Sequence, residues 1–228
     1  MLSSEELGIV VLSLKVALCS VAFSLPLAIA AAYVFARFDF AGKTLLDAVV
    51  HLPLVLPPVV VGYALLLLFG KRGVLGAWLD DWFGIVFAFR WTGAALAAAI
   101  MGFPLMVRAV RLSMASVDRR FETVARTLGA SRAWVFVSVT LPLALPGIVT
   151  GALLSFARSL GEFGATITFV SNIPGETETL PLAIYSLTQA PGGDAEALRL
   201  SAIAVVLSIG ALMASEWLTR RAFARRRT

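Results

Sequence analysis

Few charged residues in this sequence are spaced so that they could act together. Arg158 and Glu162 stand four positions apart, a spacing at which two side chains on a helix can pair. The tripeptide at 42–44 reads Gly-Lys-Thr, like the end of a phosphate-binding loop, but Arg37 stands where that motif has its first glycine. With one histidine and one cysteine, the chain has no HExxH motif and no cysteine pair for a metal. The sequence therefore predicts no catalytic residues and no metal site.

The composition indicates that the chain lives in a membrane. Of its 228 residues, 59% are apolar and 14% are charged, and the mean hydropathy is +0.90. An average soluble domain has about 25% charged residues. This chain has too few charges to cover a surface that faces water, so the lipid bilayer is its expected surrounding.

The uncharged stretches predict an all-α, polytopic membrane protein with one domain over residues 1–228. We expect five transmembrane helices, near residues 7–36, 44–69, 92–111, 142–162 and 197–217. The segment 179–193 is also uncharged, but it is short and contains Pro181 and Pro191. It is expected to be re-entrant or interfacial.

The Lys and Arg residues gather on one side of the predicted membrane. Two lie in 37–43, six in 108–132 and five in 218–228, against three in 70–92. Because cytoplasmic loops carry an excess of Lys and Arg, the N-terminus is predicted outside and the C-terminus in the cytoplasm. The net charge of +5 comes from short basic blocks between apolar segments, so nucleic acid is not an expected partner.

The predicted cytoplasmic loop, residues 116–141, contains an amphipathic pattern. Asp118 can cap a helix whose apolar face carries Phe121, Val124, Ala125 and Leu128. The opposite face carries Arg119, Arg120, Glu122, Arg126 and Thr127, with Glu122 and Arg126 at pairing distance. Gly129 suits a left-handed cap, and Ser131 can begin a second helix. Such a helix either lies on the membrane surface or docks into a groove of a soluble partner.

This loop resembles the EAA loop of ABC importer permeases. The matching residues are Thr123, Val124 and Ala125, then Gly129, then Val139, Leu141 and Pro142. Thr123 and Val124 stand where that family usually has Glu and Ala, and Glu122 comes one position early. The resemblance implies a type I ABC importer permease fold, in which this loop is the coupling helix that docks in a cleft of a cytoplasmic ATPase.

Longer stretches resemble the permeases of molybdate ABC importers. They are HLPLVLPPVVVGY at 51–63, FPLMVRAVRL at 103–112, ARTLGA at 125–130 and SFARSLGEFGATITFVSNIPGETETLP at 155–181. The resemblance implies a permease subunit in the bacterial inner membrane, with a periplasmic N-terminus. Sulfate and tungstate permeases share some of these pieces and stay as alternatives. In a different class, a secondary anion carrier is the other alternative.

The same resemblance implies the partners. They are a second copy of this chain, two cytoplasmic ABC ATPase subunits and a periplasmic molybdate-binding protein. ATP and Mg²⁺ would be bound by the ATPase, so this chain would bind no cofactor and would not itself be an enzyme.

A dianion such as molybdate needs a polar path across hydrocarbon. Pro57 and Pro58 interrupt the second predicted helix, where they either help to line such a path or simply kink the helix. The other candidates for the translocation path follow the fourth helix and are Ser159, Thr166, Thr168, Ser171 and Asn172. Arg158 and Glu162 are interpreted as a structural ion pair, with direct contact to the anion as the alternative.

Overall fold

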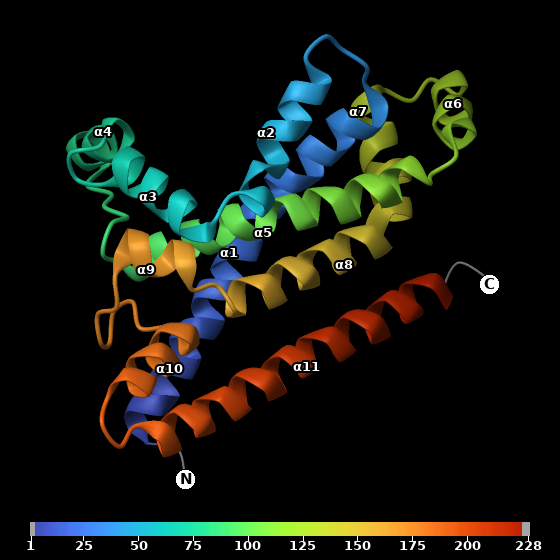
Figure 1. Ribbon diagram of the computed structural model, residues 1–228. Coiled ribbons are helices and arrows are strands. Elements are labelled where there is room, and N and C mark those ends of the chain that lie inside the picture. The colour runs from blue at the N-terminus through green and yellow to red at the C-terminus, as the bar shows by residue number, and fades with distance from the viewer. Residues whose placement is uncertain (1–2, 225–228) are drawn as a thin grey trace.

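The computed structural model describes residues 3–224, which are helical with no strand (Figure 1). The elements are α1 (Ser4–Arg37), α2 (Lys43–Val55), α3 (Pro58–Phe69), α4 (Val74–Phe83), α5 (Trp91–Ala115), α6 (Arg119–Thr127), α7 (Arg132–Val135), the π-helical turn η1 (Phe136–Thr140), α8 (Leu141–Leu160), α9 (Gly164–Val170), α10 (Leu180–Gln189) and α11 (Asp194–Ala224). Arg225, Arg226 and Arg227, which belong to the basic C-terminal block, lie outside the described residues.

Four helical segments are long and apolar enough to cross a membrane. They are Ser4–Arg37, Trp91–Ala115, Arg132–Leu160 and Asp194–Ala214. The pair α2 and α3 passes the same test only when the two helices are taken together. The described residues therefore contain four such spans, or five if this bent pair counts as one.

The helix predicted over residues 44–69 is not continuous. The structure divides it into α2 and α3, which meet at 113°. Leu56 leaves α2 in extended backbone (φ −72°, ψ 144°), because a following proline disfavours the helical conformation. Pro57 and Pro58 have no N–H to continue the ladder, and Pro58 becomes the first residue of α3, where a proline is well tolerated.

Two other predicted helices end elsewhere than expected. The helix predicted over 92–111 continues as α5 to Ala115. The helix predicted over 142–162 begins at Arg132, runs through η1 into α8 and ends at Leu160. Because Pro142 cannot donate to the carbonyl four residues back, a wider π-helical turn just before it lets the chain continue as one long helix. Glu162 consequently lies in the turn after α8.

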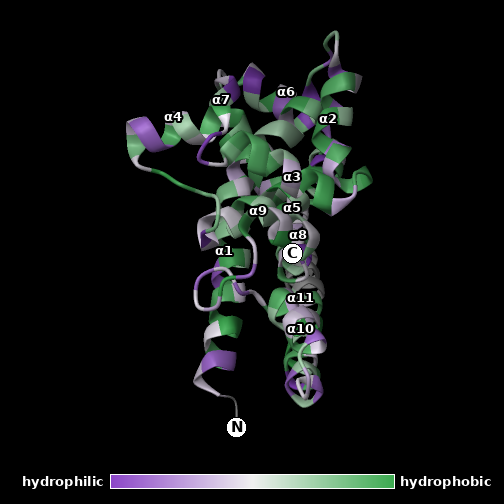
Figure 2. Cartoon of the chain, turned by 60° about the vertical axis from the view of Figure 1, so that its left-hand side comes forward, coloured by the Kyte–Doolittle hydropathy of each residue, from purple (hydrophilic) through white to green (hydrophobic). Residues whose placement is uncertain are grey.

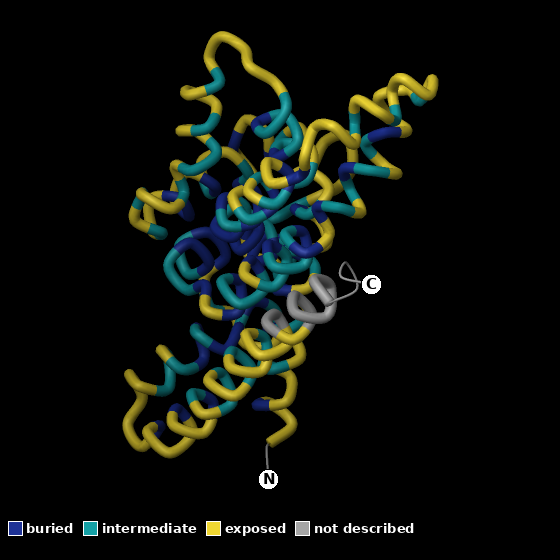
Figure 3. The backbone as a smooth tube through the Cα atoms, turned by 90° about the vertical axis from the view of Figure 1, so that its right-hand side faces the viewer, coloured by how far each residue is buried: buried dark blue, intermediate teal, exposed yellow. Residues whose placement is uncertain are grey.

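Small residues let three helices approach closely at the centre. α5 packs between α1 and α8, and its face carries Ala94, Ala97, Ala98 and Gly102, all buried. A Cβ atom on Gly102 would collide with Ser155 Oγ of α8, so glycine is required for this close approach. Figure 3 shows the buried positions gathered in the middle of the molecule, with exposed positions toward its ends.

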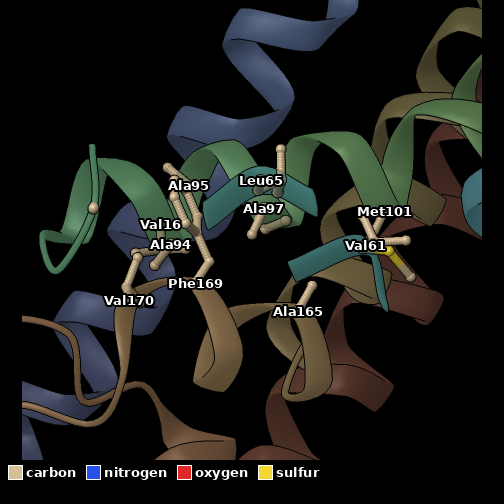
Figure 4. Close-up of a cluster of buried hydrophobic side chains, with 12 residues drawn as sticks. Val16, Val61, Leu65, Ala94, Ala95, Ala97, Met101, Ala165, Phe169 and Val170 are labelled. Atoms are coloured by element: carbon tan, nitrogen blue, oxygen red, sulfur yellow. The ribbon is translucent and has the colours of Figure 1, made fainter. Parts of the chain in front are cut away.

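A second part of the core holds the short helix α9. Phe169 and Val170 of α9 are fully buried beside Ala94 of α5 and Val16 of α1 (Figure 4). α9 also packs on α3, where a Cβ on Gly62 would lie 2.5 Å from the carbonyl oxygen of Ala165. This packing places the loop after α8 against the second half of the bent pair.

Much of the remaining surface is apolar. α2 has no buried residue, and large apolar side chains such as Val55, Val206 and Met213 are exposed. Figure 2 shows hydrophobic colour along the long helices and hydrophilic residues around α6 and at the helix ends. Apolar surface of this extent requires lipid or protein as its neighbour.

Candidate functional site

The candidate site begins with α6, whose two ends are set by local sequence. The Asp118 side chain accepts a hydrogen bond from the backbone N–H of Arg120 at 2.9 Å and so caps the helix start. At the other end Gly129 has φ +88°, the left-handed conformation that glycine adopts without strain. The N–H of Ala130 then reaches the carbonyl of Ala125 at 3.1 Å, which completes a Schellman-type helix end.

A second helix follows this turn directly. Ser131 Oγ accepts from the N–H of Trp134 at 3.2 Å and caps α7. α7 continues through η1 into α8, whose first two residues are Leu141 and Pro142. A short helix, a sharp turn and a long apolar helix thus form one connected unit, with only a few residues between α6 and α8.

One residue on the polar side of α6, Glu122, faces the rest of the chain and is half-buried, whereas Arg119, Arg120, Arg126 and Thr127 are exposed. Glu122 Oε1 lies 2.7 Å from Arg37 Nη2 and 3.0 Å from Arg37 Nε. The same oxygen accepts from Thr140 Oγ1 at 2.8 Å. Glu122 therefore joins the end of α1, the helix α6 and the last residue of η1.

The predicted pairing of Glu122 with Arg126 is thus wrong. The local spacing is suitable, but Arg37 lies 85 positions away in sequence and reaches Glu122 in the fold. No periodicity or spacing signals a contact over that separation, so Arg37 and Thr140 could not be identified from the sequence as members of this site.

The apolar side of α6 faces outward. Phe121, Val124 and Leu128 have 59%, 58% and 84% of their surface exposed. Thr123 and Arg126 are also exposed, whereas Ala125 is half-buried. An amphipathic helix on a globular protein normally buries its apolar stripe. Here the stripe is left open as a surface that another molecule can cover.

The residues considered for a polar path are divided between surface and interior. Pro57 is exposed and Pro58 half-buried at the break between α2 and α3. Thr168 of α9 is half-buried close to Gly62 of α3, and its hydroxyl donates to the carbonyl of Gly164 at 2.8 Å. The fold therefore brings Pro58 and Thr168 to the same contact between α3 and α9.

Two other candidates lie inside the chain. Ser159 is buried, and its Oγ is 2.9 Å from Ser20 Oγ of α1. Thr166 is also buried, at 2% exposure. Neither hydroxyl reaches the surface of this chain, so the structure separates both of them from Pro57.

Ser171 and Asn172 lie in the turn after α9. Ser171 is exposed and has φ +64°, an uncommon conformation for a residue with a side chain. Asn172 Nδ2 donates to Ser186 Oγ of α10 at 2.6 Å. Asn172 Oδ1 is buried and has no hydrogen-bond partner among the described residues. This turn is held to α10 but keeps one polar atom unused.

Arg158 and Glu162 pair directly. Arg158 Nη1 lies 2.6 Å from Glu162 Oε2, and the Glu162 side chain is only 2% exposed. Glu162 Oε1 accepts from the backbone N–H of Ala165 at 2.9 Å, in the first turn of α9. The carboxylate thus connects the end of α8 to the start of α9, which is what a structural ion pair would do.

The family of this chain follows from comparison with known proteins. The model of the family described as binding-protein-dependent transport system inner membrane component matches residues 24–227. The molybdenum transport system permease protein ModB of Escherichia coli (strain K12) is 60% identical over 219 residues, which are 96% of both chains. The ModB protein of Haemophilus influenzae is 55% identical over 95% of this chain and 94% of its own length.

A more distant relative and two solved structures also resemble this chain. The sulfate transport system permease protein CysT of Escherichia coli is 42% identical over 68% of this chain and 55% of its own. A bacterial ABC transporter that imports alginate superposes with a TM-score of 0.75 at 18% identity, covering 96% of this chain and 80% of its own. The MetNI methionine ABC transporter superposes with a TM-score of 0.72 at 15% identity, covering 97% of this chain and 99% of its own. This chain belongs to the family of binding-protein-dependent transport system inner membrane components and has the fold of an ABC importer permease.

Proposed function

We propose that this chain is the permease subunit of an ATP-driven molybdate importer. The observation that carries the proposal is the 60% identity to a molybdenum permease along nearly the whole of both chains. The sulfate permease in the comparison is 42% identical over a shorter stretch, so molybdate is favoured as the transported ion.

The exposed apolar stripe of α6 is the proposed contact with a cytoplasmic ATPase. Phe121, Val124 and Leu128 offer the spacing of a helix that lies in a groove, at i, i+3 and i+7. ATP and Mg²⁺ would be bound by that partner, and this chain would respond to hydrolysis by movement of α6. The polar side of α6, held to Arg37 and Thr140 by Glu122, would carry the movement to α1 and α8.

The assembly we propose contains two copies of this chain, two ATPase subunits and a periplasmic molybdate-binding protein. The extensive apolar surface of α2, α3 and α11 supports a second copy and lipid as neighbours. One structural neighbour, the alginate transporter, is described in complex with a periplasmic protein. In this assembly the N-terminus faces the periplasm and α6 faces the cytoplasm of a bacterial cell, across the inner membrane.

The path for the anion would run beside the break between α2 and α3. Pro57, Pro58 and Thr168 lie at this break or against it, and Ser171 is exposed nearby in sequence. Ser159 and Thr166 would support the path from inside the chain. Hydroxyl and backbone groups without a fixed positive charge suit an ion that must also leave.

Uptake by the reconstituted complex tests this function. Vesicles that contain the permease, its ATPase and the binding protein should accumulate radiolabelled molybdate only when ATP is supplied. Unlabelled molybdate should inhibit the uptake of labelled molybdate more strongly than sulfate does. Competition by tungstate measures how well the importer distinguishes similar dianions. Accumulation driven by a proton gradient without ATP would identify a secondary anion carrier instead.

A further inference from the structure

A cavity of about 330 Å³ lies beside the coupling loop, between α1, α6 and α7. Its charged lining consists of Arg37, Arg119, Arg126, Arg132 and Glu122. Four guanidinium groups thus meet one carboxylate in a half-open space. The proposed role of α6 uses its outward apolar stripe and leaves these arginines unexplained.

The described side chains neutralise only part of the positive charge of the cavity. The one carboxylate, Glu122, is already paired with Arg37 at 2.7 Å. Among the side chains that the structure describes, no acid forms an ion pair with Arg126 or Arg132. Arg119 makes one long hydrogen bond, 3.4 Å, to the carbonyl of Ala36.

Asp39, an acid outside the cavity that is influenced by Arg119, is already engaged. Asp39 accepts a hydrogen bond from Lys43 Nζ at 2.7 Å. This bond, together with the charges of Lys43 and Arg119, holds the pKa of Asp39 below its ordinary value. Lys43 pairs with Asp39, so the side chains that line the cavity keep three more positive than negative charges, although Arg119, Arg126 and Arg132 are also open to water. Such a cluster of exposed guanidinium groups favours an anion as its ligand.

In the orientation proposed above, the cavity would lie at the depth of lipid headgroups. From Trp91 to Arg111, α5 rises about 30 Å, close to the thickness of the hydrocarbon core. Arg111 packs over the Phe35 ring at 5.4 Å, so Phe35 of α1 is level with Arg111, which the proposed orientation puts at the cytoplasmic interface. Tyr33 and Arg37, which line the cavity, each lie two residues from Phe35 along α1. The cavity is therefore at about the same level as Phe35.

An apolar track leads from the cavity along α1. Ala22, Pro26, Ile29 and Tyr33 recur at i, i+4, i+7 and i+11, so they lie on one stripe of the helix. Ala22 and Pro26 are exposed, and Tyr33 lines the cavity. Ile29 and Tyr33 are half-buried against the core, so an acyl chain would contact the exposed edge of this stripe while its headgroup occupies the cavity.

We propose that this cavity binds the phosphate group of an anionic phospholipid. Guanidinium groups match phosphate with paired N–H donors, and basic pockets between membrane helices on the cytoplasmic side are typical sites for such headgroups. Arg126 and Arg132 provide the contacts with the phosphate, and the Arg37–Glu122 pair forms the back wall. A bound lipid would hold α1 to α6 and α7 and thereby steady the coupling loop.

Native mass spectrometry of the purified permease–ATPase complex tests the site. The complex is titrated with phosphatidylglycerol, with phosphatidylcholine as the neutral lipid. The test variant is Arg126→Gln with Arg132→Gln. The matched control is Arg120→Gln with Arg72→Gln, which removes the same charge from exposed positions outside the cavity. A third variant, Arg126→Lys with Arg132→Lys, keeps the charge and checks folding.

The wild-type complex and the control should retain phosphatidylglycerol in preference to phosphatidylcholine. The test variant should bind it more weakly, by about fivefold for each charge removed, and the lysine variant should fall between them. Equal retention by test and control variants would overturn the proposal. So would loss of the ATPase from the test variant with lipid retention unchanged, because the arginines would then bind an acidic surface of that partner. Displacement of the lipid by inorganic phosphate would reassign the site to a soluble phosphate.

Discussion

Arg37 Nη2 lies 2.7 Å from Glu122 Oε1, and this contact joins the end of the first helix to the exposed helix α6. The two side chains are only 7% and 17% exposed, so water screens the pair weakly. Thr140 bonds to the same carboxylate oxygen. One carboxylate thus holds three segments together at the point where the proposed ATPase contact meets the membrane helices.

Removing one member of this pair should uncouple transport from ATP hydrolysis. Arg37→Met leaves Glu122 without its cation and is expected to destabilise the loop by about 3 kcal/mol, as for other largely buried pairs. Molybdate uptake by reconstituted complexes should fall at least about tenfold while basal ATP hydrolysis persists. The exchanged pair Arg37→Glu with Glu122→Arg should recover part of the uptake, and a double-mutant cycle measures the coupling. Additive effects in that cycle would contradict the proposed link.

The outward stripe of α6 should matter for assembly and not for the stability of the permease. Leu128 is 84% exposed, so Leu128→Ser should change permease stability by less than about 0.5 kcal/mol. It should, however, weaken ATPase binding, which co-purification and light scattering can measure. Val74→Ser, at an equally exposed apolar position on α4, is the control and should leave assembly unchanged.

The turn at Gly129 should tolerate few other residues. A β-branched side chain at φ +88° is strained by about 1 to 2 kcal/mol, so Gly129→Val should displace α7 relative to α6. We expect uptake to be abolished while the protein remains in the membrane, and Gly129→Asn should retain more activity. Gly175→Val is the control, because it creates similar strain at φ +77° far from the loop. It should reduce uptake less than Gly129→Val does. Unchanged uptake in Gly129→Val would exclude this role for the turn.

Substitutions of Arg158 and Glu162 should lower the thermal stability of the permease more than they change its apparent affinity for molybdate. Glu162→Gln keeps the acceptor for the Ala165 N–H but leaves Arg158 without its partner, so thermal stability should drop by several degrees. Adding Arg158→Gln should recover part of this loss. The concentration of molybdate that gives half-maximal uptake should stay the same in both variants. An increase in that concentration without a loss of stability would favour direct contact with the anion.

The proposed orientation can be tested with fusions at several positions. A reporter placed after Arg227 should give a cytoplasmic signal, and so should one inserted after Ser116, just before α6. A reporter inserted after Gly175, between α9 and α10, should give a periplasmic signal. Opposite signals at these positions would reverse the orientation and remove α6 from the cytoplasm.

The helical ends of the coupling loop could be predicted because their causes are local. Asp118, Gly129 and Ser131 act on backbone groups within three residues of themselves, and the structure contains all three caps. Pro57 and Pro58 also predict a disruption of the second helix, but the sequence does not predict its 113° angle. That angle depends on how α3 packs against α9 through Gly62, a contact between segments about a hundred residues apart.

The sequence by itself determined that this chain is helical, belongs in a membrane and carries an amphipathic loop, because those properties follow from hydropathy and short-range spacing. Only the tertiary structure decided which side of α6 faces outward. An amphipathic pattern predicts that a helix has an apolar and a polar face, but it does not predict which of them packs against the rest of the chain. The carboxylate of Glu122 lies beside Arg37, 85 residues away, and so the apolar face is left for another molecule.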